Sequence, residues 1–305
     1  MNKTEKTCFF FEDISLNFDE AEGVFVTNIV TCVLNSIFSP VTCLGNFLIV
    51  FAIAKTQDLH SPSFILLGCL ATSDLLVGLL CQPIFVACKI TEVTKNFKMY
   101  CTLKMLLNTL AWIAIGSSCL TLAAVFVDRV LCLTLHLKYN ATVTVSRIFK
   151  MTSVLWIFFI IFVLVKFWVS SAWNFIAIAV SVLTFLVIAI STLKIFQIAR
   201  RHERQITVQA LALSHLQTNT LNAFKGKKST VTILYIFGLL LLFCLPYFIV
   251  SIIDIFSGYT TKVNISYSYA LTAVFMNSLI NPFVYCWRLK EIRQAVKNIL
   301  RRERH

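Results

Sequence analysis

Charged residues are scarce in this sequence, and acidic residues are the scarcest of them. Asp, Glu, Lys and Arg make up 13% of the 305 residues, whereas they make up about 25% of an ordinary soluble domain. Hydrophobic residues reach 58%, and the mean hydropathy is +0.82. A soluble fold could not hide that much apolar surface, so the composition indicates a membrane protein.

Several patterns that would indicate other classes of protein are also missing. The 11 cysteines form no CxxC pair and no Cys/His cluster, so neither a zinc site nor a disulfide framework is expected. The net charge of +13 comes from short basic runs between apolar segments, which argues against nucleic-acid binding. The first twenty residues are acidic and have neither a basic start nor an apolar core, so we expect no cleaved signal peptide.

Long apolar runs recur along the whole chain. A helix needs about 20 residues to cross the hydrocarbon core of a bilayer, and irregular backbone is too costly there. We count seven such runs and predict an all-α integral membrane protein, a bundle of seven transmembrane helices. The predicted spans are 26–54, 62–88, 101–133, 148–170, 173–199, 229–256 and 266–288.

The fourth and fifth spans are the hardest to separate. Only a short stretch around Lys166, Trp168, Ser170 and Trp173 lies between them. Its polar and interfacial residues predict a tight turn at the level of the lipid headgroups. A single long segment is the alternative.

Lysine and arginine predict the orientation, because positively charged loops stay in the cytoplasm. The acidic N-terminus, residues 1–25, is therefore expected outside the cell, and the C-terminus inside, in a multi-pass protein of the plasma membrane. Asn2 and Asn264 begin Asn-X-Ser/Thr sequons on the outer side and are predicted glycosylation sites, whereas Asn140 should stay unmodified. The residues that set this bias are Lys55, Lys138, Arg147, Lys150, Lys194, Arg200, Arg201, Arg204, Lys225, Lys227, Lys228 and the basic tail.

The last segment, residues 289–305, follows the seven-helix domain of residues 26–288. Its apolar residues recur at spacings of three and four, with basic residues on the other face, which predicts a short amphipathic eighth helix lying on the inner leaflet. A solvated charged tail is the alternative. The apolar face consists of Leu289, Ile292, Val296, Ile299 and Leu300.

Asp74 is the most informative residue of the predicted spans. A carboxylate in mid-membrane is expensive and must find a cation, a proton or polar partners. Other spans offer such partners, and together they could form one oxygen-lined pocket. Polar residues that separately bridge neighbouring helices are the alternative. The possible partners are Asn46, Ser118, Asn277, Ser278 and Asn281.

Five motifs occur in register along the chain, and together they make it similar to rhodopsin-like G-protein-coupled receptors. The resemblance spans nearly the whole sequence and implies that an extracellular ligand drives activation of a heterotrimeric G protein. The motifs are Gly45-Asn46, Leu70-Ala71-Thr72-Ser73-Asp74, Asp128-Arg129-Val130, Trp156 and Asn281-Pro282-Phe283-Val284-Tyr285.

The resemblance also implies roles for individual residues. Arg129 would contact the G protein, Asp128 would restrain it in the inactive state, and Asn281 and Tyr285 would rearrange on activation. Read without the other motifs, Arg129 would be a positive-inside anchor. The resemblance further implies an allosteric sodium site, whose ligands would be Asp74, Ser118, Asn277 and Asn281.

The sequence departs from the family pattern in the fifth and sixth spans. Cys244 stands where a tryptophan is usual, although Pro246 still predicts a kink. The fifth span has no proline and carries Thr192 where a tyrosine is usual. The family's disulfide to the second outer loop cannot form, because no cysteine occurs between Cys132 and Cys244; Cys8 and Cys88 are the possible partners of Cys101. The second outer loop without cysteine and the fifth span without proline are similar to those of the melanocortin, cannabinoid and lysophospholipid receptors.

The ligand is harder to predict than the class of receptor. Amine receptors of this family carry an aspartate in the register of Ala111, so a simple amine is not expected, and a lipid, peptide or other nonamine ligand fits. Plain packing is the alternative for every predicted pocket residue. The predicted pocket consists of Asn108, Ala111, Trp112, Lys166, Tyr267, Leu271 and Phe275.

Two other classes of protein compete with a receptor. A seven-helix transporter or channel could use Asp74 as a cation site, but the related halves and broken helix pairs of transporters are missing. An intramembrane enzyme would need an HExxH pair, paired carboxylates or a nucleophile beside a base, and the sequence offers none of these. We therefore predict a receptor and no enzyme, with no cofactor other than the sodium ion.

Overall fold

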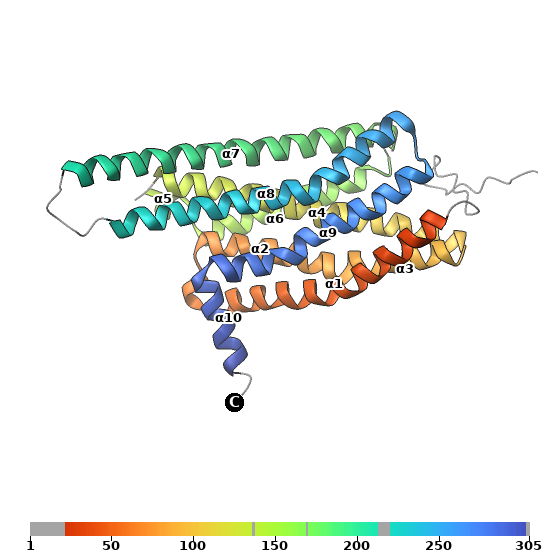
Figure 1. Ribbon diagram of the computed structural model, residues 1–305, viewed down its shortest axis with the longest axis horizontal. Helices are drawn as coiled ribbons and strands as arrows, with labels where there is room; N and C mark the ends of the chain where they lie inside the picture. Colours follow the sequence, from red (N-terminus) through yellow and green to blue (C-terminus); the bar gives the residue numbers. More distant parts are fainter. Residues whose placement is uncertain (1–21, 136–137, 169, 213–219, 303–305) are drawn as a thin grey trace, which may run out of the picture.

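The computed structural model describes residues 22–135, 138–168, 170–212 and 220–302. They form an elongated bundle of roughly parallel helices (Figure 1). The helices are α1 (Glu22–Lys55), η1 (Gln57–Leu59), α2 (Pro62–Leu76), η2 (Val77–Cys81), α3 (Gln82–Val93), α4 (Phe97–Leu135), α5 (Tyr139–Thr142), α6 (Val145–Val165), α7 (Ser170–Ala212), α8 (Thr220–Ser257), α9 (Thr261–Arg288) and α10 (Lys290–Arg302).

Seven of the described helices are long and apolar enough to cross a membrane, which confirms the predicted seven-helix bundle. The second span consists of α2, the π-helical turn η2 and α3, which together run from Pro62 to Val93. The fourth and fifth spans belong to separate helices, α6 and α7, so the alternative of one long segment is wrong. We call the end of the bundle that is predicted to be extracellular the outer end, and the opposite end the inner end.

The ends of several helices follow directly from local sequence. Thr144 and Thr260 accept hydrogen bonds from backbone N–H groups of the first turns of α6 and α9, which stabilises helix starts. Gly258 has a φ of 71° in the turn between α8 and α9, a conformation that glycine adopts without strain. These signals define where the chain reverses direction.

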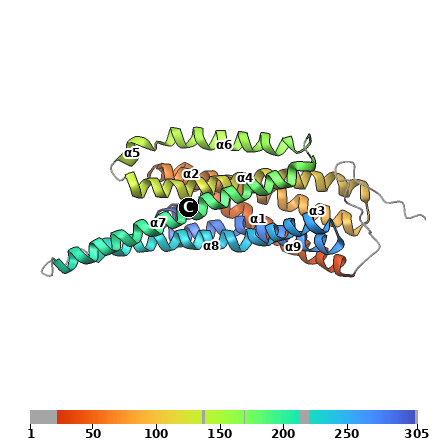
Figure 2. The same cartoon turned by 90° about the horizontal axis from the view of Figure 1, so that it is seen from above.

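Helix α6 lies at the edge of the bundle, beside α4 (Figure 2). The two helices approach closely at Gly116, where any Cβ atom would collide with the ring of Phe159. Much of the rest of α6 is apolar and exposed, including Val154, Ile157 and Phe158. This is the surface expected of a helix that faces lipid.

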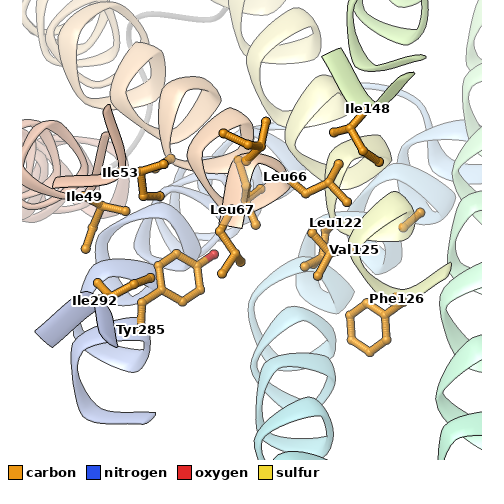
Figure 3. Packing of buried hydrophobic residues seen from close by; sticks show 14 of the residues in the cluster. Ile49, Ile53, Leu66, Leu67, Leu122, Val125, Phe126, Ile148, Tyr285 and Ile292 are labelled. Atoms are coloured by element: carbon orange, nitrogen blue, oxygen red, sulfur yellow. The ribbon is translucent and has the colours of Figure 1, made fainter. Parts of the chain in front are cut away.

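A large apolar cluster fills the inner half of the bundle (Figure 3). Tyr285 of α9, Leu67 of α2 and Ile292 of α10 belong to it. The predicted eighth helix is α10, which turns away from the bundle axis in Figure 1 and buries Ile292 and Ala295. Helices α7 and α8, of 43 and 38 residues, extend past the other helices at the inner end.

Candidate functional site

Asp74 lies at the centre of the bundle and is completely buried. Its Oδ1 accepts hydrogen bonds from the hydroxyls of Ser118 at 3.1 Å and Ser278 at 2.7 Å. Its Oδ2 accepts one from Nδ2 of Asn281 at 2.7 Å. The carboxylate therefore joins α2, α4 and α9 through three charge-assisted hydrogen bonds, as a carboxylate in mid-membrane requires.

Of the three further sodium ligands that the resemblance implies, the structure brings two, Ser118 and Asn281, to Asp74. The third, Asn277, is half-buried and makes no hydrogen bond to Asp74, and Ser278 occupies that place instead. Positions three and four residues before Asn281 both lie near its helix face. Periodicity alone could not choose between Ser278 and Asn277.

Asn46 of α1 extends this cluster. Its Nδ2 donates to the backbone carbonyls of Thr42 and Ser278, each at 3.0 Å. Its Oδ1 is buried and has no hydrogen-bond partner in the described part of the chain. A buried carbonyl oxygen without a partner is costly, and water or a cation would satisfy it.

The donor set around Asp74 fits an alkali cation. It consists of carboxylate, hydroxyl and amide oxygens, which hard cations prefer. No group of three or more His, Cys, Asp or Glu side chains that could hold a metal occurs among the described residues. The residues that would hold sodium are Asp74, Ser118 and Ser278, with Asn46 beside them.

A second constellation lies at the inner end of α4. Oδ1 of Asp128 accepts a 2.6 Å hydrogen bond from the Tyr139 hydroxyl, and Oδ2 accepts one of 2.6 Å from the Ser63 hydroxyl. Nε of Arg129 lies 3.8 Å from Oδ2. Burial and the hydrogen bond to Asp128 raise the pKa of Tyr139 to about 12, so this phenol stays protonated and donates. Sequence reasoning missed Ser63 and Tyr139, because neither belongs to a recognisable motif.

Helices α8 and α9 meet at the inner end through aromatic and cationic groups. The rings of Tyr235 and Trp287 are perpendicular, with centroids 5.6 Å apart. The guanidinium of Arg288 lies over both rings, 5.5 Å from Tyr235 and 4.7 Å from Trp287. The side chains of Lys225, Lys227 and Lys228 at the start of α8 lie outside the description. Tyr235 thus connects α8 to α9 through its contacts with Arg288 and Trp287, and this connection needs no acidic residue.

The unusual residues of α7 and α8 face the interior. Thr192 is 5% exposed and donates to the carbonyl of Ile188 in its own helix at 2.8 Å. Cys244 is also 5% exposed and packs in the inner apolar cluster with Cys119 nearby. The Tyr285 hydroxyl is buried and makes no hydrogen bond to any described residue. Thr192 and Tyr285 therefore form no hydrogen bond that connects α7 to α9 in the described part of the chain.

The residues predicted to line a ligand pocket fall into two groups at the outer half. Ala111, Leu271 and Phe275 belong to an apolar cluster. Trp112 and Tyr267 belong to a series of ring contacts that crosses the bundle, and Asn108 and Lys166 are half-buried. The successive ring pairs are Trp173–Trp112, Trp112–Tyr247, Tyr247–Tyr267 and Tyr267–Tyr259, with centroids 6.1, 6.4, 5.6 and 6.3 Å apart.

Lys166 ends α6 at the outer end and lies near Lys104 of α4. Burial, together with the positive charge of Lys104, lowers the pKa of Lys166 to about 8. Nζ of Lys104 donates to the Tyr259 hydroxyl at 3.5 Å. Lys104 is therefore an inward cation of the outer end that sequence reasoning did not identify, since it belongs to no motif.

A buried polar cluster connects α3 and α9 at the outer end. Nζ of Lys89 and Oε2 of Glu92 form a 2.7 Å ion pair, and Oε1 of Glu92 accepts from Nδ2 of Asn264 at 2.8 Å. Asn264 is 2% exposed. The glycosylation predicted at Asn264 does not fit this arrangement, because the nitrogen that a glycan would modify is buried and bonded to Glu92. Asn2, the other predicted site, lies outside the described residues.

Cys101 at the start of α4 is disulfide-bonded. Cys88 is a free, buried thiol, so the alternative that pairs Cys101 with Cys88 is wrong. Cys8, the other possible partner, lies outside the described residues. The outer end of α4 is therefore cross-linked, although the family's usual loop cysteine is missing.

Seven helices long enough to span a membrane, three of them joined through a buried carboxylate, together with an Asp-Arg pair at the inner end of α4, are features of the seven-helix class of membrane receptors. The sequence model of the 7 transmembrane receptor (rhodopsin family) matches residues 45–177 and 165–285. The chain belongs to this family. The match covers every element that carries Asp74 and its partners.

Proposed function

We propose that this chain is a plasma-membrane receptor, with its N-terminus outside, that converts the binding of an extracellular nonamine ligand into activation of a heterotrimeric G protein. The observation that carries the proposal is the hydrogen bonding of Asp74 of α2 to α4 and α9. A single buried group that joins three helices makes their arrangement depend on one set of hydrogen bonds, as a two-state switch requires. Asn281 and Tyr285 lie one turn apart on α9 and extend this connection toward the inner end.

Asp128 and Arg129 are the proposed switch at the G-protein side. In the closed arrangement Asp128 is held by Tyr139 and Ser63, and Arg129 stays beside it. Breaking these contacts would release the guanidinium toward a partner, and an arginine that is freed in this way can bind backbone or carboxylate oxygens. Pro246 within α8 and Cys244 beside it are the positions at which the sixth span would bend.

The ligand is proposed to bind at the outer half, among the predicted pocket residues. Ala111 is 5% exposed and lies in an apolar cluster with Phe275, which supports a ligand with an apolar part. Lys166 and Lys104 are the nearby cations, and Trp112 and Tyr267 offer aromatic surface. These features support a lipid or peptide over a small amine, which would need a carboxylate at Ala111.

Sodium is proposed as an allosteric regulator bound at Asp74. The ion supplies positive charge that keeps the carboxylate ionised, and it would favour the closed arrangement in which Ser118 and Ser278 face Asp74. Sodium and an agonist should then oppose each other, because a ligand that prefers one state weakens a ligand that prefers the other.

The proposal is tested by measuring dissociation of a panel of G proteins in cells that express the wild type or Arg129→Ala at equal surface levels. We expect basal signalling in the wild type and its loss in Arg129→Ala. Lys150→Ala is the control, because it removes an exposed basic residue from the same side of the membrane. Equal signalling in wild type and Arg129→Ala would contradict the G-protein assignment.

A further inference from the structure

Polar side chains line a seam between α1, α3 and α9 in the outer half of the bundle. Six such side chains are each at most 3% exposed, so this seam faces neither lipid nor solvent. Buried polar groups in a membrane-spanning region are expensive and mark paths or sites for ions and water. We call this set the polar seam; it consists of Asn28, Thr31, Asn35, Gln82, Ser268 and Thr272.

The hydrogen bonds of the polar seam leave mainly acceptor oxygens facing its interior. Thr31, Ser268 and Thr272 each donate their hydroxyl proton to a carbonyl of their own helix at 2.8 Å. Nδ2 of Asn35 donates to the Thr272 hydroxyl oxygen at 2.9 Å, and Nε2 of Gln82 donates to Oδ1 of Asn35 at 3.4 Å. The three helices are therefore bridged by side chains whose remaining lone pairs are available.

Two carbonyl oxygens of the polar seam have no partner. Oδ1 of Asn28 and Oε1 of Gln82 are buried and unbonded within the described part of the chain. The next such oxygen toward the inner end is Oδ1 of Asn46, beside Asp74. Unsatisfied buried acceptors need water or a cation. Their succession along the bundle marks positions where such species can bind.

Both ends of the polar seam meet groups that a cation prefers. At the outer end, the hydroxyl of Ser268 bonds to the carbonyl of Asn264, whose side chain bonds to Glu92. At the inner end, Asn46 bonds to the carbonyl of Ser278, whose hydroxyl bonds to Asp74. Between these ends, Ser39 of α1, whose hydroxyl bonds to the carbonyl of Gly78, and the buried Thr42 continue the row of oxygen atoms. Oxygen atoms therefore follow one another along α1 from the outer end, where Glu92 is paired with Lys89, to the buried carboxylate.

The direct route from the predicted ligand pocket to Asp74 is apolar. One turn toward the outer end from Asp74, Ser118 and Ser278 stand Val77, Ala114 and Phe275, all at most 3% exposed and in one apolar cluster. Phe85 packs edge-on against Phe275, with ring centroids 5.9 Å apart. A cation on this route would meet no oxygen ligands, so crossing it would be costly.

We propose that sodium and water exchange between the exterior and Asp74 along the polar seam and not across the apolar cluster. This inference rests on the proposed binding of sodium at Asp74 and adds the path by which the ion arrives. Asn35 is its proposed control point, because its amide group contacts both Thr272 and Gln82. The exchange rate of the ion thus depends on residues remote from those that hold it.

The test is sodium NMR of the full-length receptor in lipid nanodiscs, which gives both the affinity and the exchange rate of bound sodium. Asp74→Asn should remove the specific signal. Asn35→Leu should slow exchange by about tenfold, as the loss of roughly one hydrogen bond from the path predicts, while the affinity stays close to that of the wild type. Thr272→Val, which is nearly isosteric, should also slow exchange. It keeps the test informative if Asn35→Leu does not fold.

Ala114→Val is the matched control, since it fills the apolar route and leaves the polar seam intact. Its exchange rate should equal that of the wild type. Slower exchange in Ala114→Val with unchanged exchange in both seam variants would place the path on the apolar side and overturn the inference. A wild type with no signal that depends on Asp74 would instead refute the proposed sodium site, and the path with it.

Discussion

The hydroxyl of Tyr139 and the carboxylate of Asp128 form a 2.6 Å hydrogen bond. It ties the short helix α5 to the inner end of α4, and the Ser63 hydroxyl approaches the same carboxylate from α2. Asp128 is only 3% exposed, so these bonds operate out of water, where hydrogen bonds to a charged group are strongest. The closed state of the proposed switch is thus held by two neutral hydroxyls as well as by Arg129.

Tyr139→Phe removes one of these hydroxyls and keeps the ring. Hydrogen bonds to a charged group contribute roughly 1.5–3 kcal/mol, and about 1.4 kcal/mol is a factor of ten, so basal G-protein signalling should rise by roughly tenfold or more. Asp128→Asn should raise it as well. The measurement is G-protein dissociation at matched surface expression, and Thr142→Ala, an exposed position of the same short helix, is the control. Basal signalling of Tyr139→Phe at or below the wild-type level would refute this account of the closed state.

The contact between Tyr235 and Arg288 gives a second prediction. An exposed cation–π contact contributes roughly 0.5–1 kcal/mol, so Tyr235→Ala should raise basal signalling by about twofold to fivefold. Tyr235→Phe keeps the aromatic face and should behave as the wild type. If the two variants signal equally, the contact does not hold α8 against α9.

Sodium should stabilise the folded receptor through Asp74. A ligand present at roughly one hundred times its Kd stabilises by about 2.7 kcal/mol, which raises the Tm of the purified receptor when sodium replaces a large organic cation at constant ionic strength. Asp74→Asn should lose this increase, and Ser278→Ala should show a smaller one. Asn277→Ala is the matched neighbour and should respond as the wild type. A loss in Asn277→Ala with none in Ser278→Ala would reverse the assignment of these two residues.

The disulfide at Cys101 should be required for stability. Loss of a native disulfide typically removes about 2–4 kcal/mol, so Cys101→Ser should reduce the amount of receptor at the cell surface severalfold. Cys88→Ser, which removes a free thiol of the same outer end, should leave it unchanged. The measurement is surface labelling of the two variants in parallel. Equal amounts of both variants at the cell surface would show that the disulfide is not required for stability.

Lys166 should titrate near neutral pH. Its pKa is about 8 in the folded receptor because of burial and the nearby Lys104, whereas an unfolded lysine titrates at about 10.4. Between these values the unfolded chain binds more protons than the folded one, so this group makes stability rise with pH across that window. Below about pH 8, both forms are protonated and the slope vanishes.

Competitive acetylation of the intact receptor as a function of pH measures this titration directly. Lys104→Gln should move the midpoint of Lys166 upward, because it removes the neighbouring positive charge. Lys98→Gln, at an exposed position of the same helix, should not. A midpoint that is the same in all three proteins would mean that Lys104 does not act on Lys166.

The sequence predicted those features that depend on long or rigid patterns. Seven apolar runs gave the seven spans, and Asp74 was identifiable as a centre because a carboxylate in mid-membrane has few alternatives. The sequence named both Ser278 and Asn277 as possible partners of Asp74 but could not choose between them, since they lie three and four residues before Asn281 and flank its helix face. The role of Tyr139 could not be predicted, because it depends on how a connecting segment folds back onto α4, which periodicity does not encode.

The two longest helices have a practical consequence for anyone who wishes to image this receptor. Residues 202–212 of α7 and 220–228 of α8 extend past the apolar spans at the inner end, and at about 1.5 Å per residue they reach beyond the headgroup layer. A compact soluble domain inserted between the two helices would be held by a stiff double stem, clear of the lipid. Such an insertion would give electron cryomicroscopy a fixed feature for aligning particles of a protein whose mass otherwise lies almost entirely within the bilayer.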